Sequence, residues 1–394
     1  MFDFQLLKKE MIAELENILQ YWIEYGIDEQ FGGFVGQRDH YNKRISRASK
    51  GAVLNARILW TFSAAYNFTK NKKYLEIAHR SYNYIIQYFI DRRNGGLYWE
   101  LNEDGSVKNS RKQIYAQGFG VYGFSEYYKA TGDKIALDHA IQLFQLIEGY
   151  SFDLQYGGYI EALSEEWTKL ADMRLSAKDA NEPKSMNTHL HILESYTNLY
   201  RVWPNQELET KIRRLIRTFL NHIIDSKTGH FNLFFDFNWN IKSNIVSYGH
   251  DIEGAWLLAE AAHELADSNL SHEVELMSLK MVDATISDGM VNDGSINYEK
   301  EDDHLDSDKH WWPQAETLVG LTYAWKISGK KHYLDTMTKT WDFIKSNIVD
   351  KENGEWFWYV DKNGKPKTDN DKAGFWKCPY HNSRALMEVI NNLK

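Results

Sequence analysis

The chain carries histidines and glutamates in a repeated spacing that could transfer protons. His191 is followed by Glu194, and His250 by Glu253, at the same interval of three residues. On a helix, residues three apart lie on one face, so each carboxylate could orient the imidazole that precedes it. Imidazole has a reference pKa of about 6.5 and can therefore donate and accept protons near neutral pH. Together with His381, these residues indicate general acid–base chemistry.

Further polar and aromatic residues lie near the start of segments with helical periodicity. They are Arg57, Tyr115, Asn187, His189, Trp311, Trp312, Glu316 and Arg384. Taken singly, a histidine near a helix start is more often a cap or a core residue, and a tryptophan pair more often packs in the core. Together with His250 and Glu253, these residues come from six separate segments, so they would converge only if the segments form a closed ring. The joint pattern favours one shared site.

Metal or nucleotide chemistry is the next alternative for these residues. His189, His191, His250 and His381 with two glutamates could in principle hold zinc. However, the sequence has no HExxH motif and no cysteine pair, and helical residues two apart point in different directions. It also has no GxxxxGK[ST] loop for phosphates. We therefore expect no metal and no cofactor.

The elements that would position these residues follow from an internal repeat. A glycine-containing turn, usually with aromatic and acidic neighbours, recurs six times at intervals of about 60 to 70 residues. The turns contain Gly32, Gly95, Gly157, Gly229, Gly294 and Gly354. In each turn, glycine supports a tight bend and the following residues favour a short extended stretch. The repeat predicts six similar units.

Helical periodicity fills the intervals between the turns. Apolar residues within 212–223 recur at spacings of three and four, and a second helix after each turn is richer in small residues, as in 255–262. Six helix pairs suit either an open solenoid or a closed toroid of six inner and six outer helices. We expect the toroid, with short β-hairpin excursions at one rim, where the site should lie. Only five prolines and no linker divide the chain, which predicts a single catalytic domain over residues 1–394.

Composition excludes several classes of function. The chain is 43% apolar and 26% charged, with a net charge of −9, which argues against a nucleic-acid surface. No apolar run approaches the roughly 18 residues that a membrane helix needs. Charged residues interrupt residues 1–26, so we expect no export signal, and Cys378 is the single cysteine. These features predict a soluble cytoplasmic protein that binds neither nucleic acid nor membrane.

Aromatic residues are unusually frequent. Trp, Tyr and Phe make up 14% of the chain, with 14 Trp and 24 Tyr. Many must fill the core, which is the default interpretation. The excess is also what a carbohydrate cleft would need, because the flat C–H faces of sugar rings stack on indole and phenol rings.

Four segments resemble a known group of enzymes. Segments 186–194 (MNTHLHILE), 249–256 (GHDIEGAW), 311–316 (WWPQAE) and 374–382 (GFWKCPYHN) are similar to the cellobiose 2-epimerases of the N-acylglucosamine 2-epimerase superfamily. The resemblance covers essentially the whole chain. It implies an all-α fold, the (α/α)6 barrel, which agrees with the toroid expected from the repeat.

The resemblance also implies roles for individual residues. His250 and His381 would be the acid/base pair, and His191 would contact the opened sugar on its ring-oxygen or hydroxyl side. The reducing-end sugar would be held by polar residues, and tryptophans would stack on the disaccharide. The substrate-binding residues predicted in this way are Arg57, Tyr115, Asp179, Asn187, Glu253, Trp311, Trp312, Glu316 and Trp376. Trp256 would be a wall residue.

The implied reaction is reversible epimerisation at carbon 2 of the reducing-end glucose of β-1,4-linked disaccharides such as cellobiose, lactose or mannobiose. It would proceed by ring opening and a cis-enediol(ate), and we expect a monomer acting on a small disaccharide. An aldose–ketose isomerase would share the same intermediate. A glycoside hydrolase would use two carboxylates among Asp179, Glu253 and Glu316, which leaves the histidines without a role. A sugar-binding protein without activity is the third alternative.

Overall fold

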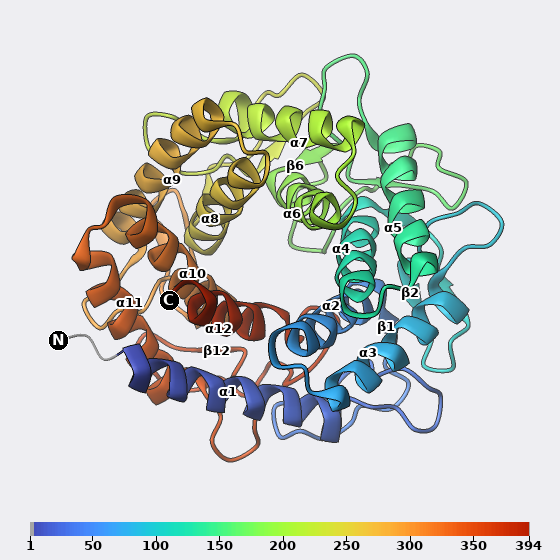
Figure 1. Cartoon of the computed structure of the whole chain (residues 1–394), viewed down its shortest axis with the longest axis horizontal. Helices are drawn as coiled ribbons and strands as arrows, with labels where there is room; N and C mark the ends of the chain where they lie inside the picture. The colour runs from blue at the N-terminus through green and yellow to red at the C-terminus, as the bar shows by residue number, and fades with distance from the viewer. Residues whose placement is uncertain (1–3, 394) are drawn as a thin grey trace.

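The computed structural model describes residues 4–393 and arranges them as two concentric layers of helices around a central axis (Figure 1). The six inner helices are α2 (Ala52–Thr69), α4 (Ile114–Thr131), α6 (Met186–Val202), α8 (Tyr248–Glu264), α10 (Trp311–Ser328) and α12 (Tyr380–Asn392). Each inner helix packs against the next, and α12 packs against α2. The inner layer is therefore a closed ring, and the prediction of an (α/α)6 barrel is confirmed.

The outer layer surrounds this ring. Its helices are α1 (Phe4–Tyr25), α3 (Lys72–Tyr84), α5 (Lys134–Leu146), α7 (Gln206–Thr218), α9 (Ser268–Gly289) and α11 (Lys331–Phe343). The apolar stripe expected in 212–223 faces inward, because Ile212, Leu215 and Ile216 of α7 are buried. Four outer helices within residues 4–393 extend into a π-helical turn, namely η1 (Ile85–Phe89), η2 (Ile147–Ser151), η3 (Phe219–Ile223) and η4 (Ile344–Ile348).

The six glycine turns lie between an outer helix and the next inner helix. Each turn is closed by an isolated antiparallel bridge, such as Ile90 with Leu97 and Phe152 with Tyr159. Gly157 and Gly158 have φ values of 73° and 78°, a left-handed conformation that side chains other than glycine rarely adopt. The turns therefore form as the sequence predicts.

Short strands join neighbouring excursions into a belt along one rim. They are β1 (Lys50–Gly51), β2 (Glu100–Leu101), β3 (Val107–Asn109), β4 (Lys112–Gln113), β5 (Ala162–Leu163), β6 (Lys184–Ser185), β7 (Phe234–Phe235), β8 (Ile245–Ser247), β9 (Glu299–Glu301), β10 (His304–Asp306), β11 (Lys309–His310) and β12 (Tyr359–Val360). The strand before an inner helix pairs antiparallel with a strand of the following excursion, as β1 does with β2 and β8 with β9. A bridge between Arg38 and Ala373 joins the first excursion to the last, so the belt closes like the helical ring.

Buried ion pairs fix the excursions beneath this belt. Lysines immediately before or near the inner helices pair with an aspartate of the preceding glycine turn, at Nζ to Oδ2 distances of 2.9, 2.7, 2.8 and 2.5 Å. The pairs are Lys50–Asp28, Lys112–Asp91, Lys184–Asp153 and Lys372–Asp350. Burial raises the pKa of Asp91, but the hydrogen bonds from Lys112 and from the backbone N–H groups of Asn94 and Arg93 together outweigh it and lower that pKa to about 2. The aspartates therefore stay ionised inside the protein.

Among residues 4–393, no helix combines the length and the apolar character that crossing a membrane would require.

We expect Lys112→Met to reduce the free energy of unfolding strongly. Both side chains of the Lys112–Asp91 pair are fully buried, so the substitution leaves a buried aspartate without its cation. Breaking a buried pair in this way costs about 3–5 kcal/mol. Urea denaturation followed by circular dichroism measures the change. Lys331→Met is the matched control, because Lys331 and Asp335 form an exposed pair worth about 0–1 kcal/mol. Equal losses in the two variants would contradict the structural role of the buried pairs.

Candidate active site

A cavity of about 460 Å³ lies where the inner helices begin, at the rim that carries the excursions. Every residue predicted to act on the substrate lines it, except Glu316. Those that line it are Arg57, Tyr115, Asp179, Asn187, His191, His250, Glu253, Trp311, Trp312, Trp376 and His381. Glu316 lies behind His381 and reaches the cavity only through that imidazole. The closed ring thus brings residues from six helix pairs to one place.

The guanidinium of Arg384 occupies the centre of the network beneath the histidines. Its Nη2 donates to Glu253 Oε1 and to Glu316 Oε1, each at 2.7 Å. Its Nη1 donates to Glu194 and contacts the hydroxyl of Tyr380. All of these side chains are buried. One cation from α12 therefore links three carboxylates from α6, α8 and α10.

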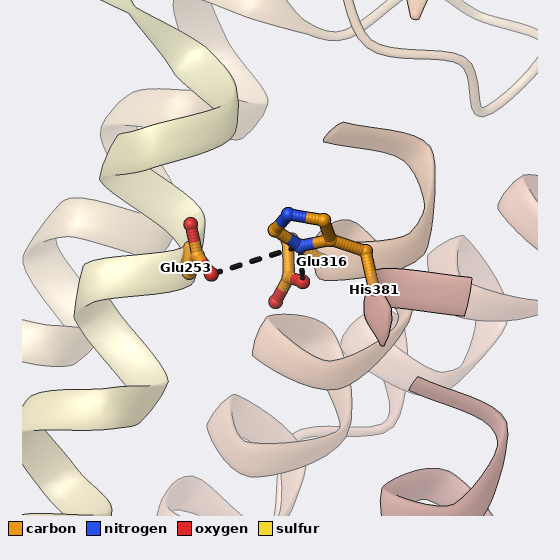
Figure 2. A group of neighbouring side chains, drawn as sticks. All are labelled: Glu253, Glu316 and His381. Atoms are coloured by element: carbon orange, nitrogen blue, oxygen red, sulfur yellow. Dashed lines mark hydrogen bonds and ion pairs between the residues drawn. The ribbon is translucent and has the colours of Figure 1, made fainter. Parts of the chain in front are cut away.

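Two of the three histidines are oriented by these carboxylates. His191 Nδ1 lies 2.8 Å from Glu194 Oε2, so the predicted pair three residues apart on α6 forms. His381 Nδ1 lies 2.6 Å from Glu316 Oε1, and Glu316 Oε2 accepts a hydrogen bond from Trp256 Nε1 at 3.0 Å. Figure 2 shows His381 above Glu316, with Glu253 on the neighbouring helix.

The prediction that Glu253 orients His250 is wrong. Among the residues that the structure describes, His250 Nδ1 bonds Ser247 Oγ at 2.8 Å and not Glu253. Glu253 instead binds Arg384, because a buried carboxylate gains more from a guanidinium than from a neutral imidazole. Helical spacing places His250 and Glu253 on one face of α8. The Glu253 carboxylate nevertheless pairs with the guanidinium of Arg384, which comes from a distant part of the chain.

Burial keeps the histidines of the cavity neutral. It lowers the pKa of His250 to about 3, with a smaller contribution from the nearby His191. Burial also lowers the pKa of His381 well below its usual value, and the charges of Arg57 and Arg384 act in the same direction. A neutral imidazole has one free nitrogen lone pair, so these rings can accept a proton at neutral pH.

The carboxylates respond to the same competition between burial and charge. Burial raises the pKa of Glu253 well above its usual value, and the nearby charge of Glu316 adds to this rise. Burial also acts on Glu194, but Arg384 and His191 outweigh it and lower that pKa to about 2. Glu194 is therefore a fixed negative charge beside His191, whereas Glu253 is the carboxyl group that takes up a proton most easily.

Arg57 brings a positive charge to the cavity wall. Its guanidinium lies against the rings of Phe119 and Tyr380, 4.2 and 4.7 Å from their centroids, and Nη2 donates to the Tyr115 hydroxyl at 2.7 Å. Arginine does not lose its proton in proteins, so this group can stabilise negative charge on an oxygen without taking part in proton transfer.

Aromatic rings form the rest of the wall. The indole of Trp312 contacts two of the histidines, with its ring centroid 4.6 Å from that of His250 and 5.7 Å from that of His381. Trp376 contacts Tyr115 and Trp99, each at 6.0 Å between ring centroids. Indole faces beside polar groups suit a ligand with apolar C–H faces and several hydroxyl groups.

His189 lies outside the cavity. Its Nδ1 is 2.6 Å from the carbonyl of Ser185, and its Nε2 accepts from the backbone N–H of Tyr159 at 2.9 Å. The expectation that His189 and His191 point in different directions is thus confirmed.

Two loops add cavity residues that the sequence reasoning missed. Residues 174–180, between β5 and β6, and the hairpin β9–β10 contribute Arg174, Ser176, Lys178, Tyr298, Glu299 and Asp306. The interval between the third and fourth glycine turns is the longest of the five, which was a signal that this excursion carries extra residues.

Glu253, Glu316 and His381 also form the kind of cluster that can hold a metal ion. One ligand atom from each lies within 4.8 Å of the others. However, Arg384 donates to both carboxylates from within the cluster. A divalent cation at this point would face the guanidinium directly, so these residues do not fit a metal ion.

The chain is similar to known sugar epimerases over nearly its whole length. Residues 32–385 match the sequence model of the family described as N-acylglucosamine 2-epimerase (GlcNAc 2-epimerase). The cellobiose 2-epimerase of Bacteroides fragilis is 49% identical over 98% of this chain and 99% of its own length. That of Dictyoglomus turgidum is 38% identical over 99% of this chain and 100% of its own. The solved structure of cellobiose 2-epimerase from Bacillus thermoamylovorans is 36% identical, covers 98% of each chain and has a TM-score of 0.94.

We expect neither chelators nor added Zn²⁺ or Mn²⁺ to change the melting temperature or the activity. Arg384 already satisfies the two carboxylates, and a ligand raises the melting temperature only if it binds the folded state. Thermal melts with EDTA and with each metal measure this. A melting temperature raised by a metal and lowered again by EDTA, or activity lost to EDTA and restored by metal, would contradict the assignment.

Proposed function

We propose that this chain, which belongs to the N-acylglucosamine 2-epimerase family, epimerises the reducing-end glucose of β-1,4-linked disaccharides at carbon 2, as a cellobiose 2-epimerase. The observation that carries the proposal is the pair of neutral histidines, His250 and His381, which both contact Trp312 and line one cavity. Inverting carbon 2 requires a proton to leave and return beside a carbonyl, and two imidazoles are suited to that task.

The cavity wall supports a disaccharide as the substrate. Its volume of about 460 Å³ is within the usual range of small-molecule sites. In our proposal Arg57, Tyr115, Asn187, Asp179 and Glu253 bind hydroxyl groups of the reducing-end sugar. The tryptophans Trp311, Trp312 and Trp376 stack on the sugar rings, and His191 contacts the opened sugar. Glu316 acts through His381 instead of touching the substrate.

The proposed reaction begins with ring opening, because only the free aldehyde acidifies the hydrogen at carbon 2. The bond between carbon 1 and the ring oxygen breaks, the carbon 1 hydroxyl loses its proton, and the ring oxygen gains one. We assign His250 to the ring oxygen during opening and closing.

His381 then removes the proton from carbon 2, and the electron pair moves into a carbon 1–carbon 2 double bond. Negative charge develops on the carbon 1 oxygen of this enediolate, where Arg57 can stabilise it. The imidazolium formed on His381 is stabilised by Glu316, 2.6 Å from Nδ1. Rotation about the carbon 2–carbon 3 bond of the open enediolate then turns its opposite face towards His381. The His381 imidazolium returns the proton to that face of carbon 2, which gives the epimer and regenerates the neutral imidazole, and no electrons are gained or lost overall.

A glycoside hydrolase would need its two carboxylates on either side of the scissile bond. Glu253 and Glu316 both bind Arg384, and Glu316 does not line the cavity. This arrangement supports an epimerase, in which Glu316 orients His381, over a hydrolase.

The proposal includes four further expectations from the sequence. The chain acts as a single catalytic domain, as a monomer, in the cytoplasm and without a cofactor. The last follows from the chemistry, because enediolate formation needs only proton transfers. Gel filtration with light scattering tests the monomer, and activity of the purified protein in a defined buffer tests the cofactor.

Heavy water tests the reaction itself. Incubation with cellobiose in D₂O should place deuterium at carbon 2 of the product's reducing-end residue. The non-reducing sugar should stay unlabelled, because its anomeric carbon is locked in the glycosidic bond. NMR of the products measures both. His381→Asn and His250→Asn should each lower kcat by about 10²- to 10⁴-fold, the usual contribution of general acid–base catalysis.

His139→Asn is the matched control for these variants, because His139 lies on the outer helix α5 and does not line the cavity. Its activity should equal that of the unaltered protein. Glucose as the product would indicate a hydrolase, and a ketose as the main product would indicate an isomerase. An epimer without deuterium at carbon 2 would exclude proton exchange through the histidines.

The pH dependence follows from the lowered pKa values of the two histidines. A base with a lowered pKa stays neutral as the pH falls through about 6.5, the usual value for histidine, and is protonated only further down. We therefore expect kcat/KM to stay near its maximum from pH 7 to below pH 6.5. Circular dichroism at each pH shows that the protein remains folded. An acid limb at or above pH 6.5 would contradict this prediction.

A further inference from the structure

Ser247 is the N-cap residue of α8, yet its side chain does not cap the helix. Its hydroxyl lies 2.8 Å from His250 Nδ1. Ser185 holds the corresponding position before α6, and there the hydroxyl accepts from the backbone N–H of Thr188 at 3.1 Å, as an N-cap serine usually does. The hydroxyl of Ser247 is thus used for the imidazole instead of the backbone.

The direction of this hydrogen bond follows from the surroundings of Ser247. The residue is 1% exposed, and a buried hydroxyl donates its proton where an acceptor is in reach. Within residues 4–393, His250 Nδ1 is the acceptor that the Ser247 hydroxyl contacts. When the hydroxyl donates to Nδ1, the single proton of the neutral ring must be on Nε2.

His381 has the opposite arrangement. Its Nδ1 faces Glu316, whose two oxygens also receive hydrogen bonds from Arg384 and Trp256, both of which can only donate. A carboxylate that accepts from these partners acts as an acceptor toward His381 as well. The proton of neutral His381 is therefore on Nδ1, and its Nε2 carries the free lone pair.

We propose that Ser247 is a positioning residue that keeps the proton of His250 on Nε2, so that His250 offers the substrate a hydrogen-bond donor while His381 offers it a base. The inference rests on the proposed epimerase function and assigns the two histidines different starting states. The donor on His250 would face the ring oxygen, which becomes more negative as the pyranose opens. The hydroxyl of Ser247 brings no charge, so no carboxylate at Nδ1 favours an imidazolium at this position.

The charges around His250 are compatible with a neutral ring. The charged or titratable groups that act on it are His191 from α6, which disfavours a second positive charge, and Glu316 from α10, which favours one. Burial outweighs both and lowers the pKa of His250. The tautomer of the neutral ring is thus the property that Ser247 can set.

The first test reads the tautomer directly. The protein is labelled with ¹⁵N in its histidines, and His250→Asn identifies the signals of His250. In the unaltered protein without substrate, we expect a protonated Nε2 and an unprotonated Nδ1 for His250, and the reverse for His381. A proton on Nδ1 of His250 would overturn the proposal. Because no turnover is needed, this result stands even if cellobiose is not the substrate, so the two proposals can fail separately.

The second test uses substitutions of Ser247. Ser247→Ala should populate both tautomers of His250 and lower kcat by about 10- to 100-fold, at the lower end of what acid–base groups contribute. KM should change little, since the hydroxyl does not line the cavity. Ser247→Thr keeps the hydroxyl and should restore both the tautomer and kcat.

Ser125→Ala is the matched control. Ser125 is also buried on an inner helix, and its hydroxyl donates to the carbonyl of Val121 at 2.7 Å. The substitution therefore removes one hydrogen bond. It should leave kcat and the tautomer unchanged, while its melting temperature reports the cost of one lost hydroxyl. If Ser247→Ala keeps full kcat, or if Ser247→Thr is as impaired as Ser247→Ala, the positioning role is wrong.

Discussion

The guanidinium of Arg384 is the interaction on which the rest of the site depends. Three carboxylates, from Glu194, Glu253 and Glu316, converge on it inside the ring with side chains at most 1% exposed. Buried charges of this kind are tolerated only when they are paired and hydrogen-bonded. The pairing connects the N-terminal halves of four neighbouring inner helices, α6, α8, α10 and α12. Two of the same carboxylates orient His191 and His381, so the compensation of charge and the orientation of these histidines have a common origin.

Buried ion pairs also stabilise the excursions that surround the Arg384 network. Each buried lysine–aspartate pair ties a glycine turn to the start of an inner helix, and the strand belt ties each excursion to the next. The inner helices carry the cavity-lining side chains near their N-terminal ends, so small shifts of these ends would move the histidines. A closed ring with a closed belt leaves little freedom for such shifts. The bridge between Arg38 and Ala373 extends the constraint across the two ends of the chain.

The partners at Nδ1 give the three histidines different chemical properties, although their side chains are identical. Glu194 and Glu316 each favour a positive charge on the ring they contact, whereas Ser247 does not. Burial opposes that charge in all three. The proton transfer that we propose at carbon 2 would benefit from such a difference, because one group must be ready to accept a proton while another donates a hydrogen bond. The fold provides this difference without a metal ligand set or a change of residue type.

The sequence by itself predicted the ring, the excursions and the residues expected to act on the substrate, all of which line the cavity except Glu316. Glycine turns and amphipathic stripes are local signals, and six near-equal repeats leave few ways to bury the apolar faces. The pair of His191 with Glu194 was also predictable, because it depends only on helical geometry.

The pair of His250 with Glu253 has the same spacing and did not form. Its outcome was decided by Arg384, which lies 131 residues away in sequence and competes for the carboxylate. Tertiary structure likewise decided that Glu316 lies behind His381, that Ser247 serves His250, and that residues 174–180 reach the cavity. Which partner a buried charge selects depends on all the charges that folding brings near it, and spacing along one helix does not contain that information.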